Sequence, residues 1–160
     1  MTVAPESSHL VLKVTPPRVP RTLLERPRLS SLRPEFVDKS VIALQASAGS
    51  GKTSLLAQWR KEALQTGTLV AWLTLDGRDN DSRLVFGLTA AMRAASGRPN
   101  FGQACLNAAG LGEGSLEAIT EWLAEVADLA AETVLFLDDV HALPDATLGS
   151  SLAYLLLNAP

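Results

Sequence analysis

The sequence predicts an α/β fold in which helices cover both faces of a parallel sheet. Short, largely apolar runs recur at residues 41–46, 68–75 and 133–139, and segments with apolar residues at helical spacing separate them. Strands buried on both faces read as continuous apolar runs, and parallel strands need helical crossovers between them. The alternation indicates one α/β domain over residues 40–160, preceded by a lead-in over residues 1–39.

The lead-in differs in composition from the domain. Six of the nine prolines stand before residue 40, and the first 40 residues carry seven basic and four acidic side chains. Proline favours extended and turn conformations. We therefore expect residues 1–39 to drape over the domain, with a short helix near residues 21–32.

The first half of the domain predicts two strands joined by a helix. VIALQA at residues 41–46 is expected to form a buried strand, and residues 68–75 a second one. Between them, residues 52–66 place apolar side chains at helical spacing, and Gly67 provides the stop.

The second half continues the alternation up to the third strand at 133–139. The other expected elements are a helix over 81–97, a glycine-rich loop over 98–114, a helix capped by Ser115 and a helix opened by Pro144 and Asp145. Asp81 or Ser82 is expected to cap the first of these helices, because both side chains accept hydrogen bonds from helical N–H groups.

A phosphate-binding loop is predicted between the first strand and the helix that follows. The residues expected to contact nucleotide are Ala46, Ser47, Ala48, Gly49, Ser50, Gly51, Lys52, Thr53 and Ser54. Gly49 and Gly51 let the backbone curl so that N–H groups converge on phosphates at a helix N-terminus. Lys52 adds a positive charge, and the Thr53 hydroxyl is placed to bind Mg²⁺. Ala46 stands where this motif usually has glycine. The pattern predicts ATP or ADP with Mg²⁺ as ligands.

Two adjacent carboxylates end the third strand. Asp138 and Asp139 stand at the carboxyl edge of the sheet, where open α/β sheets bind ligands. We expect Asp138 to hold Mg²⁺ and Asp139 to orient or deprotonate the attacking water. His141 follows closely and is expected to be a loop residue rather than a direct ligand.

Absent signatures narrow the class of nucleotide-binding protein. His141 stands where a GTPase has glycine, no Asn-Lys-x-Asp follows it, and no Leu-Ser-Gly-Gly signature of a transporter ATPase occurs. Adjacent carboxylates favour a hydrolase or a switch ATPase.

The chain resembles the N-terminal ATPase segment of the large LuxR-type transcription regulators of the STAND class, the family of the maltose-regulon activator. The resemblance covers about residues 13–160. It rests on the stretches 13–28, 45–59, 70–93 and 134–145. Its most specific part is the pattern of Trp72, Leu75, Asp76, Asn80 and Asp81 after the second strand.

The resemblance implies a three-layer P-loop NTPase fold of the additional-strand type (AAA+/STAND-like), incomplete at its C-terminus. In that strand order, residues 68–75 pair with 133–139, whereas 41–46 lacks its neighbours. It also implies a nucleotide switch: ADP holds the regulator closed, ATP permits self-association and transcription activation, and slow hydrolysis resets it. We expect this partial chain to be at most a slow ATPase and inactive alone. The family's lead-in implies that Val19 to Arg28 lines the adenine.

The alternative is the ATPase core of a helicase-like or other AAA+-type nucleic-acid translocase, because the phosphate loop and the Asp138-Asp139 pair also approach helicase motifs. A translocase must neutralise many phosphates, yet no Lys or Arg follows Arg98. We expect no specific DNA binding by this chain, no membrane association and a cytoplasmic location. The single cysteine, Cys105, excludes an intrachain disulfide.

Three further expectations concern side chains outside the loop. The tryptophans Trp59, Trp72 and Trp122 are expected in the core. Asp76 either supports the site or caps a turn. An acidic stripe on the third helix is expected to be a solvated face; it comprises Glu113, Glu117, Glu121, Glu125, Asp128 and Glu132.

Overall fold

The structure is a computed structural model that describes residues 5–18, 24–110 and 114–160. Its elements in order are α1 (Pro5–Lys13), η1 (Pro27–Leu29), α2 (Pro34–Val37), α3 (Lys52–Gln65), β1 (Leu69–Thr74), α4 (Asp81–Ser96), α5 (Gln103–Gly110), α6 (Ser115–Ala127), β2 (Thr133–Asp138), η2 (Val140–Ala142), α7 (Asp145–Thr147), η3 (Leu148–Leu152) and α8 (Ala153–Asn158). Residues 19–23, part of the stretch expected to line the adenine, and residues 111–113, part of the predicted loop over 98–114, lie outside the described residues.

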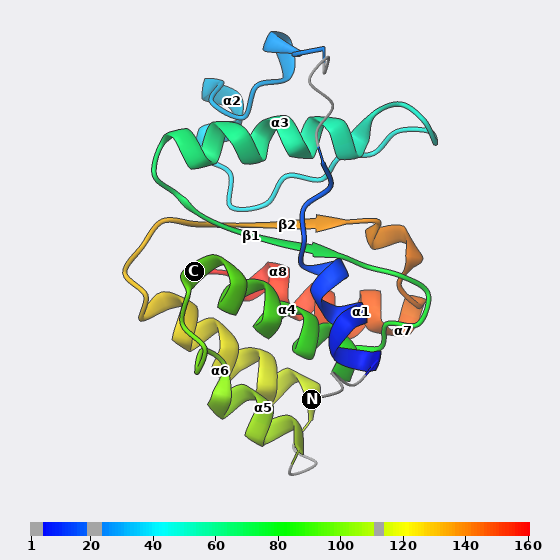
Figure 1. Ribbon diagram of the computed structural model, residues 1–160, viewed down its shortest axis with the longest axis vertical. Helices are drawn as coiled ribbons and strands as arrows, with labels where there is room; N and C mark the ends of the chain where they lie inside the picture. Colours follow the sequence, from blue (N-terminus) through cyan, green and yellow to red (C-terminus); the bar gives the residue numbers. More distant parts are fainter. Residues whose placement is uncertain (1–4, 19–23, 111–113) are drawn as a thin grey trace.

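The sheet consists of β1 and β2, which pair in parallel with Trp72 opposite Phe136 and Thr74 opposite Asp138. Helices lie on both sides of it (Figure 1): α3 covers one face, and α4 with α1, α6 and α8 lies on the other. The prediction of an α/β fold with a parallel sheet and a pairing between 68–75 and 133–139 is confirmed.

Alternate side chains of the strands belong to two separate hydrophobic cores. On the α3 face, Trp72 stacks on Phe136 with ring centroids 5.8 Å apart, and Leu55 and Trp59 of α3 pack against this pair. On the opposite face, Ala71 and Leu73 belong to the larger core built with α4, α5, α6 and α8. The predicted burial of all three tryptophans is confirmed, since Trp59, Trp72 and Trp122 are 5%, 2% and 4% exposed.

The prediction of a buried strand at residues 41–46 is wrong. This segment forms no ladder with either strand, and its side chains alternate between exposed and half-buried positions. Ile42 and Leu44 pack on the α3-side core, whereas Val41 is 44% exposed. Apolar sequence can therefore direct the segment toward the core, but a strand also needs a hydrogen-bonding neighbour.

Local capping corrects two predicted boundaries. Asn80, rather than Asp81 or Ser82, caps α4, and its side-chain oxygen accepts the Arg83 N–H at 2.9 Å. Asp81 instead accepts a hydrogen bond from Ser150 Oγ. The N-cap of α6 is Gly114, one residue before the predicted Ser115. Helix α3 ends as predicted, with Gly67 at φ 81° just beyond it.

The predicted loop over 98–114 is also wrong, because it contains α5. Gly102, which takes positive φ, directly precedes the new helix, whereas Gly97, also at positive φ, is the C-cap of α4. Cys105 is fully buried and Ala108 nearly so, which places one face of α5 in the larger core. Burial of these small side chains outweighs the loop-like composition.

The lead-in contains only short helices in its described part. The helix predicted near 21–32 lies partly outside the described residues, and η1 is the helical turn seen within the remainder. In the described ranges, every helix falls short of the length and apolar character that a membrane span requires.

Candidate functional site

The predicted phosphate-binding loop leads directly into α3. Gly49 and Gly51 have φ values of 75° and 86°, and Gly51 is the N-cap of α3 without any side-chain cap. Such positive φ values favour glycine. The first N–H groups of a helix have no partners within the helix, so the loop presents uncapped N–H groups at the positive end of the α3 dipole.

Lys52 lies at the first position of α3 and folds over the loop. Its ammonium donates to the carbonyl oxygens of Ala46 at 2.9 Å and Ser47 at 3.2 Å. No carboxylate pairs with Lys52 in the part of the chain that the structure describes. The buried hydroxyl oxygen of Ser50 likewise lacks a hydrogen-bond partner among these residues. The loop thus offers an unneutralised cation and a free hydroxyl.

The other predicted nucleotide contacts keep positions compatible with binding. Ala46, Ser47, Ala48 and Gly49 are exposed, and Thr53 and Ser54 are half-buried in the first turn of α3. The loop is therefore open to a ligand. Thr53, the residue predicted to bind Mg²⁺, follows Lys52 in the first turn of α3.

The two predicted carboxylates differ sharply in environment. Asp138, at 7% exposure, is buried, and its Oδ1 accepts the N–H of Asp139 at 3.0 Å. The Asp139 side chain is 49% exposed, its backbone has φ 56°, and His141 Nδ1 lies 3.9 Å from its Oδ1. A non-glycine residue at positive φ is uncommon and tends to mark turns or functional sites.

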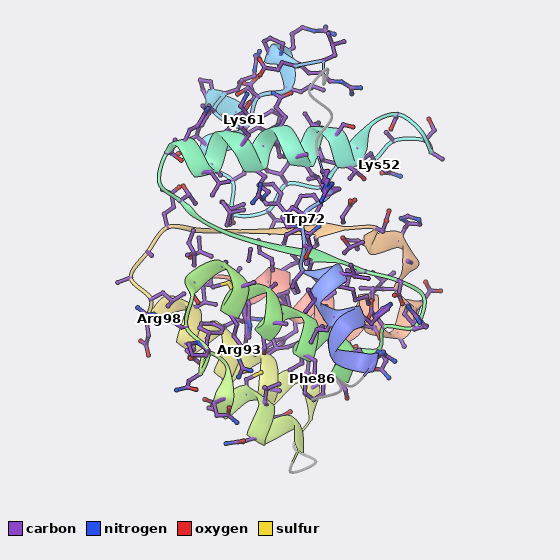
Figure 2. The ribbon with its side chains drawn as sticks, viewed as in Figure 1. Lys52, Lys61, Trp72, Phe86, Arg93 and Arg98 are labelled. Atoms are coloured by element: carbon purple, nitrogen blue, oxygen red, sulfur yellow. The ribbon has the colours of Figure 1, made fainter. Side chains whose placement is uncertain are left out.

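The loop and the strand ends lie on one side of the molecule. Helix α3 runs opposite in direction to β1 and β2, so its N-terminus and the C-terminal ends of both strands face the same way (Figure 1). Figure 2 shows Lys52 at this end of α3. Among residues 5–18, 24–110 and 114–160, no group of three or more His, Cys, Asp or Glu side chains forms a ready metal cage.

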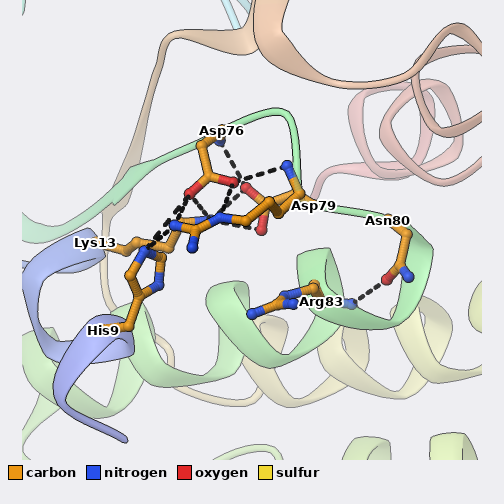
Figure 3. Close-up of polar contacts among 7 residues, drawn as sticks. His9, Lys13, Asp76, Asp79, Asn80 and Arg83 are labelled. Carbon is orange, nitrogen blue, oxygen red and sulfur yellow. Dashed lines mark hydrogen bonds and ion pairs between the residues drawn. The ribbon is translucent and has the colours of Figure 1, made fainter. Parts of the chain in front are cut away.

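Asp76 acts in a turn and an ion cluster (Figure 3). Its carboxylate accepts the backbone N–H of Arg78 at 2.8 Å and pairs with the Arg78 and Lys13 side chains, at 3.1 and 3.3 Å. The hydrogen bond from the Arg78 side chain is the main cause that lowers the pKa of Asp76, against the opposing effect of burial. Of the two predicted roles, the turn role is the one that these contacts support.

Sequence reasoning missed two contributions of the lead-in. Lys13 of α1 pairs with the buried carboxylate of Asp79, which is 3% exposed. Arg26 donates to the carbonyl oxygen of Ser50 in the predicted phosphate-binding loop at 3.1 Å. The acidic run after the second strand indicated that a basic partner was needed. The sequence did not indicate that this partner would be Lys13, which lies 66 residues from Asp79 in the chain.

Comparison with known proteins identifies relatives over most of the chain. The HTH-type transcriptional regulator MalT of Vibrio parahaemolyticus is 31% identical over 154 residues, which cover 92% of this chain and 16% of the relative. MalT of Vibrio cholerae is 30% identical with the same coverage. The serine/threonine-protein kinase PknK of Mycobacterium tuberculosis is 30% identical over 147 residues, covering 89% of this chain and 13% of the kinase. No family model and no solved structure matches the chain.

These relatives support the predicted family and do not favour the translocase alternative. The chain spans about one sixth of the MalT proteins that it matches. The activities in the relatives' names belong to much longer proteins, and the matched segment occurs in both a transcriptional regulator and a kinase. The chain is therefore a homologue of one segment that MalT and PknK share, in agreement with the resemblance of its sequence.

Proposed function

We propose that the chain is the nucleotide switch module of a MalT-like transcription regulator and binds ATP or ADP with Mg²⁺ through residues 46–54. One observation carries the proposal: the loop passes through two positive-φ glycines into the uncapped N-terminus of α3, beside the unneutralised ammonium of Lys52. Backbone N–H groups and a lysine in this arrangement suit the phosphates of a nucleotide.

Each predicted residue then has a defined role. Lys52 exchanges its two loop carbonyls for phosphate oxygens, and the Ser50 hydroxyl gains a partner. Thr53 and Asp138 hold the cation, which supplies charge neutralisation when bound. Asp138 is suited to this role because it is buried and, in the described part of the chain, has no cationic partner. The more exposed Asp139 orients the attacking water.

The proposal includes the finer fold and the domain division. Helices on both sides of the sheet suit a three-layer P-loop NTPase of the additional-strand type, with the lead-in over 1–39 and a partial ATPase domain over 40–160. In the larger regulator, this module acts in the cytoplasm, hydrolyses ATP slowly and controls self-association, while DNA is read by another part of the protein.

The direct test is titration of the full chain with a fluorescent ADP analogue. Lys52→Ala should abolish most of the affinity, because the phosphates lose their main counter-charge. Lys39→Ala removes the same charge from an exposed position outside the loop and should leave binding unchanged. Equal affinity of wild type and Lys52→Ala would refute the assignment. Asp139→Asn should bind normally but lose any ATP turnover that the wild type shows.

A further inference from the structure

We propose that Arg26 is a second cation for the phosphates of the nucleotide, delivered to the loop from the lead-in. This inference rests on the proposed function. Its starting point is the hydrogen bond from the Arg26 guanidinium to the carbonyl oxygen of Ser50, 3.1 Å long. The bond brings a residue 24 positions away in the chain to the last turn of the loop before α3 begins.

The position of Arg26 is set by its own backbone. The Arg26 N–H donates to Oε1 of Gln58 at 2.9 Å, and Gln58 is a buried residue of α3. Pro27 follows directly and restricts the backbone of the residue before it. Both constraints act on the main chain, so the guanidinium remains free to choose its acceptor.

The segment after Arg26 is also fastened to α3. The indole N–H of Trp59 donates to the carbonyl oxygen of Leu29. Glu62 Oε2 accepts the backbone N–H and the hydroxyl of Ser31 at 2.8 and 2.6 Å. Burial opposes ionisation of Glu62, but the hydrogen bonds from Gln58 and Ser31 outweigh it and lower its pKa. Arg26 therefore stands at the end of a segment held along the same helix that begins at the phosphate loop.

The guanidinium lies against the glycine that caps α3. A Cβ atom added to Gly51 would meet the Arg26 Nη2 atom at 2.9 Å. Lys52 contacts the start of the loop through the carbonyl oxygens of Ala46 and Ser47. Two cations thus contact the loop that leads into one uncapped helix N-terminus, and within the described residues neither is paired with a carboxylate.

This arrangement suits a ligand with at least two phosphates. In the absence of a carboxylate partner, both cations use neutral carbonyl acceptors, which bind a charged donor more weakly than phosphate oxygens do. Arginine can bind phosphate through two parallel N–H groups. The Arg26 side chain is exposed, so it can turn from Ser50 to a ligand without unfolding the lead-in.

The experiment compares Arg26→Ala, Arg26→Lys and Arg98→Ala with wild type, using ADP and adenosine as probes and calorimetry on the full chain. Arg98 is a matched control, since it is an exposed arginine outside both the lead-in and the loop, and its replacement should leave ADP affinity unchanged. Arg26→Ala should weaken ADP binding about tenfold, the size expected for one exposed charge-assisted hydrogen bond. Adenosine affinity should not change, Arg26→Lys should fall in between, and the loss should shrink as salt is raised.

The outcomes separate this inference from the proposed function. Equal ADP affinity of Arg26→Ala and wild type overturns the role of Arg26 while leaving the loop assignment intact. Tighter ADP binding by Arg26→Ala also overturns it and shows that the guanidinium blocks the loop. No ADP binding by the wild type overturns the proposed function, and the inference falls with it. Circular dichroism of each variant, together with the charge-retaining Arg26→Lys, excludes a loss of fold as the cause.

Discussion

The ammonium of Lys13 pairs with the carboxylate of Asp79 and fastens α1 to the turn between β1 and α4. The Asp79 side chain is only 4% exposed and that of Lys13 only 11%. Asp79 also accepts the backbone N–H of Asp76 at 2.7 Å, which closes the turn. A buried charge is costly unless it is paired, so the docking of the N-terminal helix and the shape of this turn depend on each other.

Removal of the Lys13 charge should therefore destabilise the chain strongly. Lys13→Met leaves Asp79 buried and unpaired, and we expect the free energy of unfolding to fall by about 3 kcal/mol. The double variant Lys13→Met/Asp79→Asn should recover most of this loss, because asparagine is neutral and still accepts the Asp76 N–H. Chemical denaturation measures both values.

Lys61→Met is the matched control for this experiment. Lys61 pairs with Glu25 at 3.0 Å, but the two side chains are 64% and 67% exposed. An exposed pair of this kind contributes at most about 1 kcal/mol. If Lys13→Met lowers the free energy of unfolding no more than Lys61→Met does, the Lys13–Asp79 pair does not stabilise the docking of α1.

The same cluster predicts a dependence of stability on pH. The pKa of Asp76 is lowered, first by the Arg78 side-chain hydrogen bond, and Lys13 contributes as well. Because the folded-state pKa lies below the unfolded one, ionised Asp76 adds stability above the ordinary carboxyl pKa of about 4. That contribution is lost as the pH falls below this value.

Asp76→Asn isolates the charge, since its side-chain oxygen can still accept the Arg78 N–H. At pH 7 we expect its melting temperature to lie about 2–4 °C below that of wild type, which corresponds to about 1 kcal/mol in a chain of this size. The difference should shrink as the pH is lowered toward 3. A difference that stays constant over this range would show that packing, not charge, sets the effect.

The contrast between this cluster and the sheet shows what sequence can reveal. Apolar runs and helical spacing predicted β1, β2, α3 and α4, because each pattern is local and its burial is the main driving force. The pairing of Lys13 with Asp79 joins positions 66 residues apart, and nothing in either local sequence specifies its partner. The place of Arg26 against the loop is non-local in the same way.

The two wrong elements fail for different physical reasons. At 41–46 the side-chain pattern was read correctly, but a strand exists only through hydrogen bonds to another strand. At 98–114 the glycines suggested a loop, yet the burial of Cys105 and Ala108 stabilises a helix, α5, within this range. The proposed phosphate-binding residues could be named from the sequence because they occupy consecutive positions; their role stays a prediction.

Two glycine substitutions should separate backbone strain from contact with Arg26. Gly49 and Gly51 both have positive φ, but an added Cβ meets Arg26 only at Gly51 and meets nothing within 4 Å at Gly49. Each alanine should cost about 1–2 kcal/mol of stability through strain. At Gly51 the added Cβ also displaces the Arg26 guanidinium, but this exposed side chain can turn away at little cost. The two alanines should therefore destabilise the chain about equally, and Arg26→Ala should rescue neither. Rescue of Gly51→Ala alone would show that the guanidinium is held rigidly against the N-terminus of α3. Thermal unfolding of the five variants decides between these results.

Residues 41–46 carry a strand-like sequence without a strand's hydrogen bonds. In β1 and β2 the backbone groups pair with each other from Leu69 opposite Thr133 to Thr74 opposite Asp138. An amide proton in such a ladder exchanges with solvent only when the ladder opens. Amides of 41–46 should therefore exchange much faster than those of β1, although Ile42 and Leu44 are half-buried on the α3-side core. Hydrogen–deuterium exchange followed by mass spectrometry resolves the two segments in one experiment. Helix α3, which follows the same loop and has its own internal bonds, is the positive control for protection. If 41–46 is protected as strongly as β1, the segment has a strand partner in solution and the two-stranded sheet is not the complete sheet.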